Sequence, residues 1–189
     1  PRVKILFADV EEYANLNIDE KHDVFFHLAW EKTFGDSRDD VFAQLKNVDY
    51  SMDAIRLAHR SGCSSFIGAG SQAEYGPVTV PLSEHTPINP QSGYGVAKYS
   101  VGKLGGLLSK SLGLRFNWIR VLSIYGSMDN PYTLIMYAVR EMKKGQSPEL
   151  TKCEQIWDYL NEIDAAKAFF AVGEKGVDQK TYILGSGSG

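Results

Sequence analysis

The chain has 189 residues, 43% of them hydrophobic, and a formal net charge of -3 at pH 7. These values predict one globular unit with a substantial core, and they argue against nucleic acid as the main partner. No apolar run approaches the roughly 20 residues of a membrane span, and neither Cys63 and Cys153 nor the four histidines have the spacing of a metal site. We therefore expect no membrane span and no metal, and the cysteine usage is typical of the reducing cytoplasm.

Alternating strands and helices are the main pattern of the first half of the chain. Apolar runs rich in β-branched residues predict strands at 3–10 and 23–30, and apolar residues at helical spacing predict a helix over 41–62. Residues 65–71, "SFIGAGS", predict a third strand that ends in small residues. The run 76–93 is rich in Pro and Gly and is therefore expected to be a loop.

The second half continues the same alternation. The pattern predicts, in chain order, a helix at 94–112, a strand at 115–126, a helix at 131–145, a short strand at 155–160, a helix at 164–176 and a strand at 181–187. Apolar strands separated by helices imply a parallel sheet that is covered on both faces. We therefore expect a doubly wound, Rossmann-like α/β fold.

One polar residue ends the third predicted strand, and two more lie in the first turns of the next predicted helix. Ligands of such sheets bind beyond the carboxyl ends of the strands, where Ser71 stands. Tyr94 and Lys98 lie four residues apart on one helix face, and a cation held near a phenol favours the phenolate. An isolated pair of this kind is usually a solvated or structural pair. Together with Ser71, the pair is a much more specific signal for proton transfer to a bound alcohol or ketone.

Four motifs occur in one order along the chain: "FIGAGSQAEYG", "NPQSGYGVAKYSVGKL", "RVLSIYG" and "IWDYLNEIDAAKAF". On these motifs the sequence resembles the extended short-chain dehydrogenase/reductase family. Within that family it is similar to the NAD-dependent epimerase/dehydratase group, which acts on nucleotide sugars. The resemblance runs from about Val3 to the final glycine. It implies hydride transfer at a sugar carbon, NAD or NADP as the cofactor, and a homodimer when the protein is full length.

The resemblance also implies roles for particular residues. Tyr94 would be the catalytic acid/base, Lys98 would bind the nicotinamide ribose and lower the tyrosine pKa, and Ser71 would hold the reacting oxygen. The expected cofactor contacts are Asp9, Val10, Ala29, Asn47, Tyr94, Lys98 and Leu122. The expected substrate contacts are Ser71, Gln72, Ser123 and Trp157. Two positions depart from the family pattern: Ser123 replaces a commoner asparagine, and the motif that usually reads "HLAA" here reads "HLAW".

One departure bears on the type of reaction. The sugar 4,6-dehydratases carry an Asp-Glu pair directly after the Ser/Thr, because elimination of water needs an acid and a base. Gln72 and Ala73 occupy these places, and Glu74 is displaced by one residue and is expected to point elsewhere. We therefore expect 4-epimerisation or 4-keto reduction of a nucleotide sugar. The alternatives are an oxidoreductase for a non-sugar alcohol and a catalytically silent dinucleotide-binding scaffold.

The glycine-rich cofactor fingerprint of the family is absent from the sequence. The family places it before the strand at 3–10, and after 187 it continues into a lobe that caps the sugar. We therefore expect residues 1–189 to be the central part of one NAD(P)-binding Rossmann-like domain, incomplete at both ends, with the start of the substrate lobe within about 125–160. A sheet of this kind has unpaired strand edges and a bare apolar helix face. The choice between NAD and NADP stays open.

Overall fold

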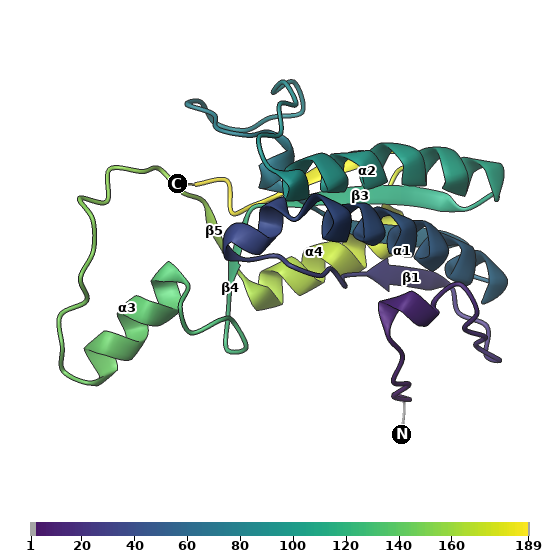
Figure 1. Ribbon diagram of the computed structural model, residues 1–189, viewed down its shortest axis with the longest axis horizontal. Helices are drawn as coiled ribbons and strands as arrows, with labels where there is room; N and C mark the ends of the chain where they lie inside the picture. Colours follow the sequence, from purple (N-terminus) through teal and green to yellow (C-terminus); the bar gives the residue numbers. More distant parts are fainter. Residues whose placement is uncertain (1–2, 189) are drawn as a thin grey trace.

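The computed structural model describes residues 3–188 and contains a parallel sheet with helices on both faces (Figure 1). The main sheet has the strand order β1-β2-β3-β6, and these strands are Val24–His27, Ser65–Ser71, Arg115–Val121 and Thr181–Leu184. Every neighbouring pair is parallel, and the register sets Phe25 beside Phe66 and Ser71 beside Val121. The predicted Rossmann-like α/β fold is confirmed.

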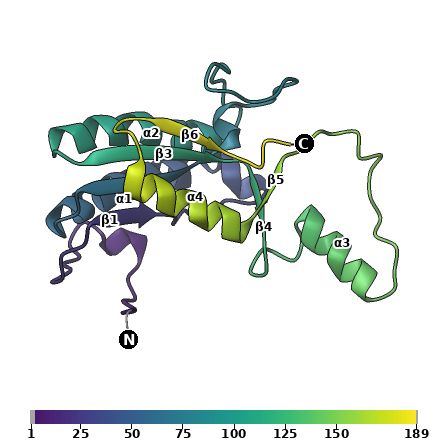
Figure 2. The same cartoon turned by 180° about the vertical axis from the view of Figure 1, so that it is seen from behind.

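Three helices cover the sheet. Helices α1 (Val41–Arg60) and α2 (Gly93–Ser111) lie on one face, and α4 (Glu162–Lys175) lies on the opposite face, as Figures 1 and 2 show from opposite sides. Asp40 and Ser92 cap α1 and α2, because their side-chain oxygens accept N–H groups of the first turn. These caps fix where each helix begins relative to the strand ends.

A ladder of aromatic rings forms the core between the sheet and the α1–α2 layer. Consecutive rings lie nearly parallel, with centroids 5.6, 5.9 and 6.2 Å apart, and they belong to Phe25, Phe66, Phe116 and Trp118. The indole of Trp118 covers the neighbouring strand at Gly68 and Gly70. A Cβ atom at either glycine would come within 2.4 Å of the Trp118 ring, so these two positions must lack a side chain.

A second, smaller sheet leads away from the main one. Strand β4 (Ser123–Tyr125) pairs in parallel with β5 (Tyr159–Asn161). Between them the chain makes an excursion that carries helix α3 (Leu134–Lys143), and both views show this helix standing apart from the layered part (Figures 1 and 2). The excursion falls where the sequence places the start of a substrate lobe, which stays a prediction. Within residues 3–188 no helix is long and apolar enough to cross a bilayer.

One expected strand is wrong. Residues 3–9 are irregular, and the chain then forms the 3-10 helix η1 (Val10–Glu12). A parallel strand needs a neighbour to accept and donate its backbone hydrogen bonds, and among the described residues no strand pairs with this segment. Its apolar side chains are consequently exposed, Phe7 by 92%.

Several other elements have shorter bounds than expected; the strand predicted at 181–187, for example, ends at Leu184. The strand predicted at 23–30 ends at His27, and the helix predicted at 131–145 begins only at Leu134. The strand predicted at 115–126 divides into β3 and β4, and the one predicted at 155–160 begins only at Tyr159. Before α3 the Asn130 side chain accepts the Tyr132 N–H at 2.9 Å, and this local hydrogen bond replaces a regular helical one.

The outer edge of the sheet at β1 carries exposed apolar side chains. Strand β1 has a strand partner on one side only among the described residues. Phe26 and Leu28 beside that edge are exposed by 39% and 63%, and Phe42 at the start of α1 is exposed by 80%. These side chains form an uncovered apolar edge, and the incompleteness of the domain stays a prediction.

Candidate functional site

Ser71 and Tyr94 meet at the carboxyl end of β2. Ser71 is the last residue of the strand, and its hydroxyl caps the short 3-10 helix η3 (Gln72–Glu74) by accepting the Ala73 N–H at 3.1 Å. Tyr94 stands in the first turn of α2, which is tied down because the Gly93 N–H donates to Asp39 Oδ1 at 2.6 Å. Ser71 lowers the pKa of the Tyr94 phenol, against the opposite effect of burial.

Lys98 lies one turn further along α2 and is almost fully buried, with 4% exposure. Its ammonium donates to the Ala69 carbonyl oxygen at 2.7 Å and lies 5.7 Å from the centre of the Tyr94 ring. Burial lowers the pKa of Lys98 to about 7, although the negative charge of Glu74 acts to raise it. The three predicted catalytic residues therefore lie together at the end of one strand.

Tyr94 is held as a protonated phenol near neutral pH. Burial raises its pKa, and Ser71 and the positive charge of Arg38 act in the opposite direction. The Arg38 guanidinium lies over the Tyr94 ring, 4.6 Å from its centre. The sequence predicted Lys98 as the group that lowers this pKa, whereas the groups that lower it in the structure are Ser71 and Arg38.

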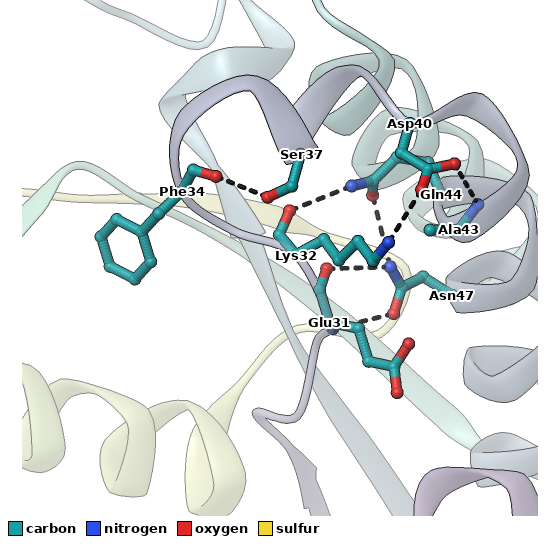
Figure 3. Close-up of polar contacts among 8 residues, drawn as sticks. All are labelled: Glu31, Lys32, Phe34, Ser37, Asp40, Ala43, Gln44 and Asn47. Carbon is teal, nitrogen blue, oxygen red and sulfur yellow. Dashed lines mark hydrogen bonds and ion pairs between the residues drawn. The ribbon is translucent and has the colours of Figure 1, made fainter.

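A hydrogen-bonded loop follows β1 and is held by the start of α1 (Figure 3). Asn47 is buried and makes two bonds with the backbone of Glu31, accepting its N–H at 3.0 Å and donating to its carbonyl at 3.1 Å. Gln44 donates to the carbonyl oxygen of Lys32, whose ammonium pairs with Asp40 at 2.8 Å. Asn47 thus fixes the loop that carries Ala29, and direct contact of these two residues with a cofactor stays a prediction.

Glu74 has a structural role beneath the site. It is fully buried and accepts hydrogen bonds from the Ser71 N–H at 2.9 Å, the Trp118 indole at 2.8 Å and Arg120 Nε at 2.7 Å. Arg120 also donates to the hydroxyl of Tyr75 at 3.1 Å. The displaced position predicted only that Glu74 points elsewhere; the structure shows the carboxylate bonded within the core, from where it holds the backbone of Ser71.

The remaining predicted residues divide into two groups. The structure brings Ser123 and Trp157 together, because the Trp157 indole donates to the Ser123 hydroxyl at 2.5 Å. Leu122 links β3 to β6 through its N–H, and Gln72 follows Ser71 in η3. Asp9 and Val10 lie apart from these residues: Asp9 caps η1, which packs against α1.

Two residues at the site were given no role from the sequence. The ring of Trp30 lies against the Lys98 ammonium at 3.7 Å and edge-on to Tyr94 at 6.0 Å. The departure from the "HLAA" pattern was the signal that could have identified Trp30. Nothing in the sequence indicates that Arg38 reaches Tyr94, because its position depends on the anchoring of the loop before α1.

Ligands of open parallel α/β sheets bind beyond the carboxyl ends of the strands, and this is where the hydroxyl, the phenol and the buried ammonium lie. A sequence model of the NAD dependent epimerase/dehydratase family matches residues 3–185. The chain therefore belongs to this family, as the motifs predicted.

Individual relatives agree with this assignment. The chain is 27% identical over 180 residues to a putative UDP-glucose 4-epimerase of Methanocaldococcus jannaschii, covering 89% of this chain and 58% of the relative. It is 25% identical over 163 residues to the dTDP-6-deoxy-L-talose 4-dehydrogenase (NAD(+)) of Aggregatibacter actinomycetemcomitans, covering 84% and 58%. The chain thus spans somewhat more than half the length of these relatives.

Solved structures show the same fold. RMD from Pseudomonas aeruginosa, complexed with NADPH, has a TM-score of 0.83 at 21% identity, covering 94% of this chain and 65% of that one. The UDP-glucose 4-epimerase of Thermotoga maritima, solved with UDP-glucose, has a TM-score of 0.78 at 25% identity, covering 87% and 56%. Neighbours are solved with NAD or NADPH, so the expected class of cofactor is confirmed for the family.

Proposed function

We propose that the protein is an NAD(P)-dependent oxidoreductase or epimerase that acts on a nucleotide sugar by hydride transfer at a sugar carbon, as a 4-epimerase or a 4-ketoreductase. The observation that carries this proposal is the grouping of Ser71, at the end of β2, with Tyr94 and the buried Lys98 of α2, whose ammonium lies 5.7 Å from the centre of the Tyr94 ring. The names of the relatives, which include UDP-glucose 4-epimerases and a nucleotide-sugar 4-dehydrogenase, support the same class of substrate.

The residues present fit a nicotinamide cofactor. Lys98 and Tyr94 are hydrogen-bond donors in a desolvated site, and such donors suit the hydroxyl groups of a ribose. When bound, NAD or NADP would accept or supply the hydride. We assign further cofactor contacts, by the family pattern, to Asp9, Val10, Ala29, Asn47 and Leu122.

The protonation state of Tyr94 determines what the chain itself does. As a protonated phenol it donates its proton to the keto oxygen of a 4-keto sugar, which Ser71 orients by its hydroxyl. In the reverse direction the same pair removes the proton of a sugar hydroxyl, and the nearby charge of Arg38 then stabilises the phenolate. Gln72, Ser123 and Trp157 are proposed to contact the sugar nucleotide.

Dehydration is the less favoured reaction, because Gln72 and Ala73 provide neither the acid nor the base that elimination requires. The alternatives are an oxidoreductase for a non-sugar alcohol and a silent scaffold.

Both cysteines are free, which suits the proposed cytoplasmic location. Exposed apolar residues on one face of α2, among them Val96 and Leu107, suit the proposed homodimer.

The test is an assay of the full-length protein with UDP-glucose and with a dTDP-4-keto sugar, following both the absorbance of reduced nicotinamide and the sugar products. Net oxidation of the cofactor identifies a reductase, and a 4-epimer without net cofactor change identifies an epimerase. Tyr94→Phe should abolish turnover and leave cofactor binding intact. Tyr99→Phe on the same helix is the matched control and should keep activity. Absence of turnover with every nucleotide sugar would refute the proposal.

A further inference from the structure

Trp30 contacts both members of the Tyr94–Lys98 pair. The Lys98 ammonium lies 3.7 Å from the centre of its ring, and the ring meets Tyr94 edge-on at an interplanar angle of 84°. Apart from the Ala69 carbonyl oxygen at 2.7 Å, no hydrogen-bond acceptor of the described residues lies within bonding distance of the ammonium. The indole face is therefore a principal contact of a buried cation.

The orientation of the indole is fixed by buried polar groups. Its N–H donates to Gln44 Oε1 at 2.9 Å, and Gln44 is only 2% exposed. Gln44 is held in turn by the Lys32 carbonyl at 3.1 Å and by the Asn47 amide at 3.3 Å. Turning the indole would leave a buried acceptor with one partner fewer, which is costly. The ring is thus a rigid wall of the site.

The charged and titratable groups around Lys98 leave its charge weakly compensated. His27 of β1 faces it as a neutral ring near pH 7, because burial and the charge of Lys98 lower the pKa of His27 to about 4. Tyr94 of α2 is neutral, and Arg38 of η2 (Gly35–Asp39) adds positive charge beside it. Glu74 of η3 is the anion among these groups, and Arg120 already pairs with it.

We propose that Trp30 is a positioning residue for Lys98, whose indole face holds the ammonium beside Tyr94 and stabilises its charged form. The ring quadrupole attracts a cation placed over its face, most strongly where water is excluded. The inference rests on the proposed function for the role of Lys98, but the contact itself comes from the geometry. It gives the tryptophan of "HLAW" a task that an alanine at this position cannot perform.

The test measures the titration of Lys98 directly, by nitrogen NMR of isotope-labelled lysine side chains, with the signal assigned through Lys98→Arg. In Trp30→Leu the pKa of Lys98 should fall by about one unit, a tenfold loss in proton affinity. Trp30→Phe keeps an aromatic face and should restore most of the difference. Trp157→Leu, which removes an indole with no contact to Lys98, should leave the titration unchanged.

If Trp30→Leu does not fold, Gln44→Met releases the indole and should shift the titration by a smaller amount in the same direction. An unchanged or raised pKa of Lys98 in Trp30→Leu, or in Gln44→Met where that variant replaces it, would overturn the inference. This measurement needs no substrate, so it separates the two proposals: lack of turnover counts against the proposed function, and an unmoved titration counts against the role of Trp30. In an active enzyme, the pH profile of kcat should move in Trp30→Leu and return in Trp30→Phe.

Discussion

Replacing Arg120 by methionine should destabilise the protein strongly, although Arg120 lies outside the proposed catalytic group. The Arg120 side chain is 11% exposed and its partner Glu74 is fully buried, with 2.7 Å between Nε and Oε2. Removing one partner of a buried pair leaves the other charge uncompensated, which costs about 3–5 kcal/mol. Glu74 would keep its bonds from the Ser71 N–H and the Trp118 indole, so we expect a loss near the lower end of that range.

Urea unfolding at pH 7 measures this loss. With a slope typical of a domain of this size, the midpoint should fall by about 1–2 M. The double variant Glu74→Leu with Arg120→Met replaces the pair by apolar side chains and should regain most of the stability. The control is Arg56→Met, which breaks an exposed ion pair with Asp53 and should cost less than about 1 kcal/mol.

Two results would refute this reasoning. One is a loss below about 1 kcal/mol in Arg120→Met, which would mean that water reaches the carboxylate. The other is a double variant as unstable as the single one, which would mean that Arg120 acts through packing alone. If the reasoning holds, Arg120→Met should also weaken the hold of Glu74 on the backbone of Ser71, and any enzymatic activity should fall more than the folded fraction does.

Further expectations concern packing and charge. Gly68→Ala should lower the free energy of unfolding by about 1–3 kcal/mol in urea titrations, because its Cβ would meet the Trp118 ring, and equal stability would contradict this contact. His27 binds a proton near pH 6.5 in the unfolded chain and only near pH 4 in the folded one. The contribution of neutral His27 to the free energy of unfolding should therefore be complete above about pH 6.5 and decline toward pH 4. This pH dependence should be absent in His27→Gln. Arg38→Leu should raise the pKa of Tyr94, observed by NMR of labelled tyrosine, since the charge of Arg38 lowers it, and an unchanged value would exclude that effect.

The sequence predicted the elements whose signals are local. The predicted bounds of α1, α2 and β2 lie within two residues of the observed ones. The strand expected at 3–10 has the composition of a strand, but composition cannot supply the neighbour that a strand needs for its hydrogen bonds. The division of 115–126 at Leu122 likewise depends on which strand pairs with each half.

The candidate site was predicted in part for the same reason. Ser71, Tyr94 and Lys98 lie close together because strand end and helix start are fixed by the fold, which the alternation of elements indicated. Arg38 reaches Tyr94 only through the fold of η2, and the local sequence carries no sign of that. The protonation states also depend on burial, which spacing alone does not give: Lys98 and Tyr94 each have a pKa shifted toward the neutral form.

The indole of Trp118 restricts which substitutions this sequence can accept during evolution. Its ring occupies the volume above Gly68 and Gly70, so the run of small residues that leads into Ser71 is a requirement of packing. Positions 68, 70 and 118 should therefore vary together. Homologues with a smaller residue in place of Trp118 are free to carry alanine or serine at positions 68 and 70, and homologues with tryptophan are not. An alignment in which a side chain at Gly68 coexists with this tryptophan would show that the strands can separate to admit both.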